Sequence, residues 1–554
     1  MLQDPGKDIN NTSHSDYANN SNDSEVLCPI SYRVIVEEKY IMTTEIKIYP
    51  KQANTHGLKH DSLSFGEVLA QSFAVIAPTT IPASNLGLIV ALSGNGTWLS
   101  FLLGLIGLVL VSININQFAS RSASAGSLYS YIVKGLGPTA GVICGWSLVL
   151  AYLLTGMSVL CGFANFSGIL FGHLGIHPSS ISLLALGAGI AWYAAYKDVQ
   201  LSAMTMLCLE GGSIVLISIL GLIIWTHYGF SLDLAQLTLE GVSPGHIATG
   251  LVLVMFGFSG FESATSLGGE AKKPLQNIPK AVIGSVVVAG LFFTLMSYIE
   301  ILGFHQAGVD ISSIESPLTF LSQESGVSWL GDIIAIGALF SFFTCVLGSI
   351  NPAARIFYTM AQHGLFHASL GSSHATNRTP HVAVSLCSFI LFLVPAVMAL
   401  FQIKLFDCMG YFGALCSYGF LTVYVLISIA APVYLYKIRK LRLHHVIIAC
   451  VAVGFMFIPV LGSVGIPGSE LFPIPEYPYN LFPYLFLFYL VLTCGWFAWQ
   501  KMRSPELALS MTRRTTDRYN YQPVSPTPLL NMGMSPRLRK MRNGRRSSSN
   551  FDRD

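Results

Sequence analysis

The chain has 554 residues, of which 52% are hydrophobic and only 11% are charged, and its formal net charge is +3. Soluble domains carry about 25% charged residues, so this composition and the mean hydropathy of +0.58 exclude an ordinary soluble protein and indicate a membrane protein. The chain lacks a GxxxxGK[ST] phosphate loop, an HExxH motif and a GxSxG motif, which argues against a nucleotide-driven motor and against an enzyme.

Two polar ends flank a long apolar centre. Residues 1–60 are predicted to form a hydrophilic cytoplasmic tail that is largely disordered, since its first part is rich in Asn, Ser and Asp. Within it, residues 32–37 alternate between polar and apolar side chains, so a short strand is possible there. The N-terminus lacks the basic region followed by an apolar region that is typical of a signal peptide. Residues 501–554 are predicted to form a basic, disordered cytoplasmic tail. The helical domain is expected over 61–500.

Twelve apolar ranges in this domain are long enough to span a bilayer. They are 66–93, 97–118, 137–163, 179–196, 200–226, 246–269, 280–304, 329–361, 382–403, 408–435, 445–463 and 480–499. With a cytoplasmic N-terminus, the inward side receives twelve basic residues, Arg355 counted among them, and the outward side only Lys404. This bias predicts a multi-pass protein of the plasma (inner) membrane with both termini in the cytoplasm.

Two of the twelve ranges contain residues that weaken a helix. The first range has Pro78 and Pro82 beside three hydroxyl side chains, and each proline removes a helix hydrogen bond; a tolerated kink is the alternative interpretation. The sixth range contains Gly257, Gly260 and the acid Glu262. Irregular backbone at bilayer depth is tolerated only where it is buried in protein or lines a cavity, and an acid there is by default a functional hypothesis. Together they predict a solute site.

The two weakened ranges occupy matching positions if residues 66–226 and 246–435 are the halves of an inverted repeat. Interrupted segments at corresponding positions of two halves are the best sequence pointer to a transporter site. An odd number of crossings in each half gives the halves opposite orientation. Helices 11 and 12, at about 445–499, are then additions. We therefore expect an all-α membrane protein with twelve transmembrane helices and breaks in helices 1 and 6.

Several motifs resemble those of one transporter family. They are Gly257–Ala264 followed by Gly269–Pro274 and Asn277–Pro279, Ala125–Tyr131 with Gly135–Pro138, Gly145–Trp146, and Ala354–Arg355 with Thr379–His381. Together they are similar to the amino acid–polyamine–organocation family, over about 66–500. The resemblance implies a 5+5 inverted-repeat fold with discontinuous helices 1 and 6 and two extra helices. It also implies secondary active transport of an amino acid or related amine by alternating access, through symport or exchange.

The resemblance also implies where a substrate binds. In that family the substrate carboxylate lies near amides at the helix 1 break and its ammonium faces carbonyls at the helix 6 break, which matches the partial charges of helix ends. Phe256 takes the position of an aromatic lid, with plain packing as the alternative. The expected substrate-binding residues are Ala77, Pro78, Thr79, Thr80, Ile81, Phe256, Gly257, Phe258, Ser259 and Gly260.

Coupling or gating is assigned to Glu210, Glu262, Phe256, Ser349 and Asn351. Glu210 lies roughly 15 Å along the fifth helix at 1.5 Å per residue. It either carries a proton or is a structural acid hydrogen-bonded to hydroxyls on helices 1 or 8. Ser349 and Asn351 are candidate ligands for Na⁺, the alternative coupling ion to H⁺. Glu262 is expected to brace the broken helix by accepting amide hydrogen bonds.

Two other classes of function stay open at this point. A channel would need a continuous polar stripe on several helices, and a transporter-like nutrient sensor would suit the long tails. The spacing of His363 and His367 is compatible with a metal, but a polar loop is the preferred interpretation, and no Cys/His metal spacing occurs. We expect no cofactor and no nucleic-acid partner. The expected partners are the lipid bilayer and a small-molecule substrate, and homo-oligomerisation is left open.

Overall fold

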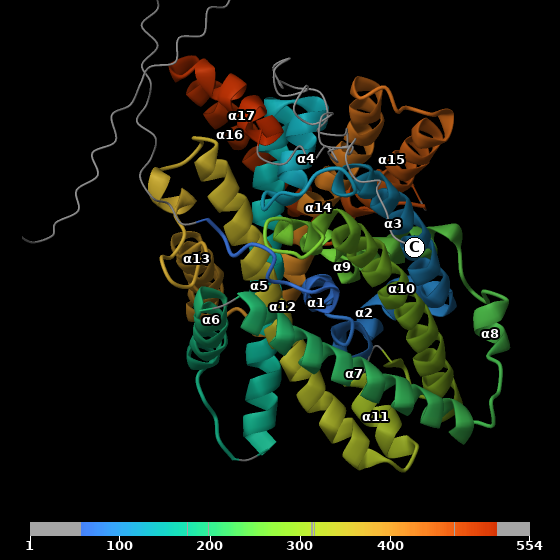
Figure 1. Cartoon of the computed structure of the whole chain (residues 1–554). Helices are drawn as coiled ribbons and strands as arrows, with labels where there is room; N and C mark the ends of the chain where they lie inside the picture. The colour runs from blue at the N-terminus through green and yellow to red at the C-terminus, as the bar shows by residue number, and fades with distance from the viewer. Residues whose placement is uncertain are drawn as a thin grey trace, which may run out of the picture. The chain divides into compact units, whose positions relative to one another are not determined.

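The computed structural model describes residues 57–517, apart from residues 174, 198, 312, 313, 315 and 470. The open strand at 32–37, almost all of the N-terminal tail and the basic stretch near the C-terminus lie outside the described residues. In the described part the regular structure is helical, and an isolated parallel bridge joins Leu63 to Ala271. The all-α expectation is thus confirmed for the described part (Figure 1).

The first half of the domain begins with a broken helix. Helix α1 (Phe65–Ile76) is followed by a π-helical turn, η1 (Ile81–Asn85), and by α2 (Leu86–Ser93). The elements that follow are η2 (Gly94–Gly96), α3 (Thr97–Ala119), α4 (Ser127–Leu136), α5 (Pro138–His173), α6 (Ser180–Lys197) and α7 (Val199–His227).

The second half repeats this pattern of an interrupted first helix. Helix α9 (Pro244–Gly257) ends in a turn, and a 3₁₀ segment, η3 (Phe261–Leu267), continues the chain. The other elements are α8 (Leu234–Leu237), α10 (Pro274–Ala307), α11 (Pro317–Glu324), α12 (Ser328–Gln362), η5 (Ala368–Gly371), α13 (His381–Leu400), α14 (Leu405–Lys437), α15 (Leu443–Val464), η6 (Tyr479–Leu481), α16 (Phe482–Arg503) and α17 (Glu506–Asp517).

The length and apolar composition of its helices indicate that this chain is a multi-pass membrane protein. Ten helical stretches of the described part are long and apolar enough to cross a membrane, and the first of them, Phe65–Ala119, contains two of the predicted ranges. Helix α6 is not among the ten, although it overlaps the fourth predicted range. The count of twelve crossings and the inverted repeat therefore stay predictions.

The broken helices lie inside a ring of longer ones. Helix α1 contacts α7, α10, α12 and η3, while α5 packs against both α12 and α14 (Figure 1). Nearly all of η1 and η3 is buried, so their irregular backbone is shielded from lipid. This arrangement places the two breaks at the centre of the bundle.

The C-terminal boundary differs from the sequence expectation. Helix α17 occupies residues where an irregular tail was expected, and it packs against α4, α5 and α16. Leu507 and Met511, four residues apart on one face, are buried. Since residues at this spacing share a helix face, this apolar pair accounts for the docking of α17.

Candidate substrate site

The first break is a tight turn after α1. Ala77 adopts a left-handed conformation with φ 47°, and the amide and hydroxyl of Thr80 both donate to its carbonyl, at 3.0 and 2.8 Å. Pro78 contributes no amide donor. The Thr79 amide lies 3.4 Å from Oε1 of Glu210. The amides of Thr79 and Thr80, which were expected to receive a substrate carboxylate, thus already have partners in this conformation.

The second break depends on Gly260, which has φ 86°. A Cβ at this position would lie 2.0 Å from Cγ1 of Val75, near the end of α1. The two breaks therefore touch, and glycine is required both by the backbone conformation and by the close approach. Ser259 closes α9 by donating to the Met255 carbonyl at 2.9 Å. No described residue donates a hydrogen bond to the carbonyl of Gly257.

A small cavity lies between the breaks. Its volume is about 20 Å³, little more than the ~10–15 Å³ that one water needs, so an amino acid enters only if lining side chains move. The lining residues are Val75, Ile76, Ala77, Thr80, Ile81, Asn85, Thr155, Ser158, Val159, Phe256, Gly257, Phe342, Cys345 and Met409. None of these side chains is acidic or basic. The polar groups are hydroxyls, one amide and one thiol.

The predicted site residues divide into two groups. Ala77, Thr80, Ile81, Phe256 and Gly257 line the cavity, and Pro78, Thr79, Phe258, Ser259 and Gly260 do not. Phe258 lies in a cluster with Phe101 and Phe293, with ring centroids 6.4 and 5.2 Å away. The ring of Phe256 packs beside Gly413 of α14.

Sequence reasoning missed the walls contributed by other helices. Thr155 and Ser158 come from α5, Phe342 and Cys345 from α12, and Met409 from α14. The only signal in the sequence was the spacing of three between the two hydroxyl residues of α5, which places them on one helix face.

Glu210 connects the first break to α12. Its carboxylate accepts from Ser341 Oγ (3.0 Å), Thr344 Oγ1 (3.1 Å) and Thr79 Oγ1 (3.3 Å), in addition to the Thr79 amide. Hydroxyls on predicted helices 1 and 8, here the break after α1 and helix α12, are the partners expected if Glu210 is a structural acid. The single hydrogen of the Thr344 hydroxyl can go either to Glu210 or to the Ser341 carbonyl at 2.9 Å, so the firm donors to Glu210 are Ser341 and the amide and hydroxyl of Thr79.

Glu262 braces the second break through phenols. It is fully buried, and its two oxygens accept from Tyr152 Oη at 2.7 Å and Tyr424 Oη at 2.8 Å. We expected hydrogen bonds from backbone amides; Glu262 does interact with its own backbone amide, but the two phenols are added partners that were not expected. Two tyrosines on separate helices, α5 and α14, thus anchor the start of η3.

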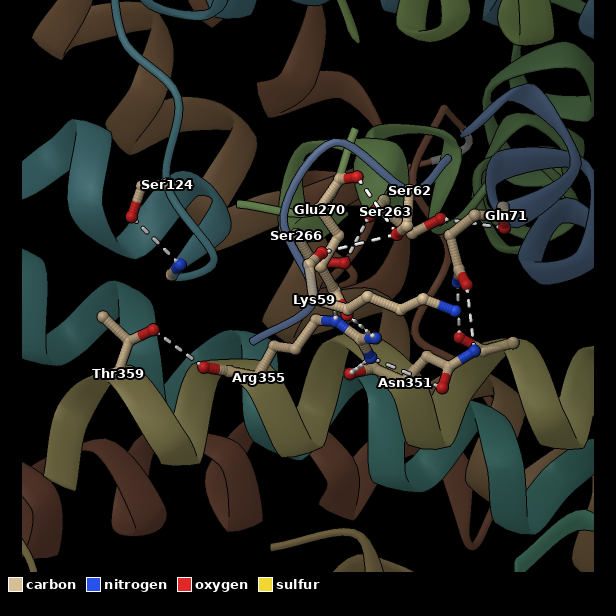
Figure 2. Close-up of polar contacts among 12 residues, drawn as sticks. Lys59, Ser62, Gln71, Ser124, Ser263, Ser266, Glu270, Asn351, Arg355 and Thr359 are labelled. Carbon is tan, nitrogen blue, oxygen red and sulfur yellow. Dashed lines mark hydrogen bonds and ion pairs between the residues drawn. The ribbon is translucent and has the colours of Figure 1, made fainter. Parts of the chain in front are cut away.

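A second polar network lies beyond the breaks, along α12 (Figure 2). Arg355 donates to Glu270 through Nε (2.6 Å) and Nη2 (3.0 Å), and both side chains are almost completely buried. The Glu270 carbonyl in turn accepts from the amides of Ser62 and Leu63, which precede α1. This pair joins the segments after η3 and before α1 to α12. Arg355 was expected among the inward charges between spans; it lies inside α12, where Glu270 compensates its charge.

Neither Ser349 nor Asn351 lines the cavity. Ser349 lies on α12 beside Gly156 of α5, whereas Asn351 belongs to the network around Arg355. Asn351 donates to Gln71 Oε1 at 3.1 Å and accepts from Arg355 Nη1 at 3.4 Å. Gln71 also donates to the carbonyl of Gly348 at 2.7 Å. These bonds hold α1 against α12. In the described part of the chain, no group of three or more His, Cys, Asp or Glu residues is arranged to hold a metal ion.

Comparisons with known proteins find transporters of similar sequence. The model of the family described as "Amino acid permease" matches residues 67–504. The branched-chain amino acid permease BcaP of Bacillus subtilis is 26% identical over 393 residues, covering 68% of this chain and 81% of that protein. The low-affinity putrescine importer PlaP of Escherichia coli K12 is 27% identical, with 66% and 80% covered. The serine/threonine exchanger SteT of B. subtilis is 22% identical, with 59% and 76% covered.

Proposed function

Because this chain belongs to the amino acid permease family, we propose that it is a secondary active transporter of an amino acid with an uncharged side chain, working by alternating access. The transport is symport or exchange coupled to H⁺ or Na⁺, and the protein lies in the plasma membrane with both termini in the cytoplasm. The observation that carries the substrate class is the cavity between the breaks, whose lining includes no acidic or basic side chain.

The chemistry of the lining discriminates between amino acids and diamines. The zwitterionic backbone of an amino acid needs helix-end amides and carbonyls, and the Gly257 carbonyl, with no donor among the described residues, supports the ammonium side. The ammonium of a lysine side chain, or the second ammonium of a diamine, would enter a cavity whose lining has no carboxylate to compensate its charge. An uncompensated buried charge costs roughly 3–5 kcal/mol, so we expect cations to be rejected.

This selectivity predicts the effect of adding a carboxylate. Ser158 lines the cavity and donates to the Met409 carbonyl at 2.7 Å. Ser158→Asp should increase the ability of lysine and putrescine to compete with leucine at least tenfold, measured as inhibition of leucine uptake into liposomes. Ser158→Asn, of nearly the same shape but neutral, is the matched control and should not. Equal competition by cations in both variants would contradict the proposed selectivity.

The bonds of Glu210 favour a structural role over that of a proton carrier. Gln fits at this position. If its NH₂ group faces Thr344 Oγ1, the Thr344 hydroxyl can donate to the Ser341 carbonyl at 2.9 Å instead. Only the charge is lost. We expect Glu210→Gln to lower uptake about fivefold, for the ~1 kcal/mol of a weakened hydrogen bond to the break, with the same pH profile as the unchanged protein. A flattened profile would instead identify Glu210 as the proton carrier.

Alternating access needs a closed side, and we assign it to the network around Arg355 and Glu270. With the predicted topology this pair lies on the cytoplasmic side of the cavity. Substrate release inward then requires the segments around Ser62 and Glu270 to leave α12. A channel is disfavoured because the polar lining is confined to a cavity of about 20 Å³. The nutrient-sensor alternative predicts that shortening the tails to residues 57–517 abolishes output; a transporter so shortened retains uptake.

A further inference from the structure

One buried acid has no role in the site described above. Five glutamates of the described part are buried: Glu67, Glu210, Glu262, Glu270 and Glu300. The first four have partners, namely the Ser64 amide, the hydroxyls around Glu210, two tyrosines and Arg355. Neither carboxyl oxygen of Glu300 has a hydrogen-bond partner in the described part of the chain.

The level of α10 that contains Glu300 is buried. Glu300 lies in α10, where all residues from Ile299 to Phe304 are buried, so neither lipid nor water reaches this level of the helix. One turn away, Met296 packs against Gly221 of α7 and Gly303 against Leu321 of α11. Phe304 stacks on Phe320 of α11 with ring centroids 5.1 Å apart. Helix α11 thus covers this part of α10.

An ionised carboxylate is not stable in such a place. Burying a charge without a partner costs several kcal/mol even after relaxation, and a group so placed takes up a proton instead. The titratable residues on elements packed against α10 do not change this. They are Glu67 on α1, Cys208, Glu210 and His227 on α7, Glu262 on η3 and Glu324 on α11, and none is hydrogen-bonded to Glu300. Of these, Cys208, His227 and Glu324 are exposed on the outside of the bundle.

The position of Glu300 links its surroundings to the first break. Helices α10 and α11 both contact η1, and Ile81 and Asn85 of that turn line the cavity. Glu300 is seven residues, or roughly 10 Å at 1.5 Å per residue, from the end of α10 that the predicted topology places outside. A movement of η1 and α11 that opens the cavity outward would also admit water to Glu300.

We propose that Glu300 is the proton site of transport: neutral while the cavity is closed, and exchanging its proton with water when α11 and η1 separate from α10. A metal cation is a poor occupant, because in the described part of the chain no group of three or more His, Cys, Asp or Glu residues is arranged to hold one. The proposal rests on the proposed transport function and selects H⁺ over Na⁺ as the coupling ion.

The test separates proton movement from substrate movement. Purified protein is placed in liposomes containing a pH-sensitive dye, and a neutral amino acid is added outside. The unchanged protein should show substrate-evoked proton flux. Glu300→Gln should reduce that flux at least tenfold, while exchange of labelled for unlabelled amino acid stays within about threefold, since exchange releases no net proton. Glu324→Gln, at the exposed end of α11, is the matched control and should keep both activities.

Three results would overturn the proposal or its basis. Full proton flux in Glu300→Gln, or amino acid uptake by the unchanged protein without any proton flux, overturns the proton site alone. No uptake or exchange at all in the unchanged protein overturns the proposed function with it.

Should Glu300→Gln fail to fold, a measurement on the unchanged protein replaces it. Dicyclohexylcarbodiimide adds to a protonated carboxyl group: the acid proton moves to a carbodiimide nitrogen, the carboxyl oxygen bonds to the central carbon, and acyl migration leaves a stable N-acylurea with no leaving group. Mass spectrometry should find this adduct on Glu300, at a level at least tenfold above Glu324. Its absence from Glu300 contradicts the proposal.

Discussion

Replacing Gly260 with alanine should abolish most transport, with uptake at least tenfold lower per folded molecule. The added Cβ would meet Val75 Cγ1 at 2.0 Å, and φ of 86° is strained for alanine. Such strain costs on the order of 1–3 kcal/mol, and the clash displaces α1 from the second break. The measurement is the initial rate of amino acid uptake into liposomes with equal amounts of folded protein.

Gly308→Ala provides the matched control for this variant. Gly308 also has a positive φ, 67°, but nothing lies within 4 Å of an added Cβ. It therefore carries the backbone strain without the contact between breaks, and uptake should stay within about twofold of the unchanged protein. Equal rates for Gly260→Ala and the unchanged protein would show that close packing of the two breaks is not needed for transport.

Removing Arg355 should destabilise the fold more than any change at the surface. Arg355→Met leaves Glu270 buried without its cation, which costs roughly 3–5 kcal/mol. A buried ion pair replaced as a whole by apolar residues is often neutral in stability. The double variant Arg355→Met with Glu270→Met should therefore recover most of the loss. Unfolding the detergent-purified protein with heat or denaturant measures the stability of the single and the double variant.

A more exposed hydrogen-bonded pair serves as the comparison. His305 lies 2.6 Å from Asp233, and its side chain is 42% exposed, so His305→Asn should cost only about 0–1 kcal/mol. If Arg355→Met is no more destabilising than His305→Asn, the pair with Glu270 does not hold the segments before α1 and after η3 against α12. Transport by a stable double variant would then show how far this closure controls release of substrate.

The breaks themselves could be predicted because they conflict with their surroundings. Pro78 and Gly260 weaken helices at a depth where water cannot replace lost hydrogen bonds. The same reasoning predicted a bracing role for Glu262, and for Glu210 it left open a proton carrier or an acid with hydroxyl partners. It did not give the partners of Glu262, because Tyr152 and Tyr424 are distant in sequence and nothing in their spacing indicates that they meet.

The walls of the cavity could not be predicted for a related reason. Helix α5 is largely apolar, and beyond the spacing of Thr155 and Ser158 nothing in its sequence shows that these two residues face inward. The same is true of Phe342 and Met409. Arg355 was counted with the loop charges because only its pairing with Glu270, 85 residues away, makes burial tolerable. Glu300 carried no signal beyond being an acid in an apolar range, and its importance follows from the absence of partners in the described residues.

Uptake by the unchanged protein tests the central claim most directly. Purified protein in liposomes is given an inward proton gradient and labelled leucine, serine, lysine or putrescine. We predict that leucine or serine accumulates, that each competes with the other, and that lysine and putrescine at the same concentration neither accumulate nor compete. Accumulation of only the cations, or of none of the four, would contradict the account of the cavity between the two breaks as the site of a neutral amino acid.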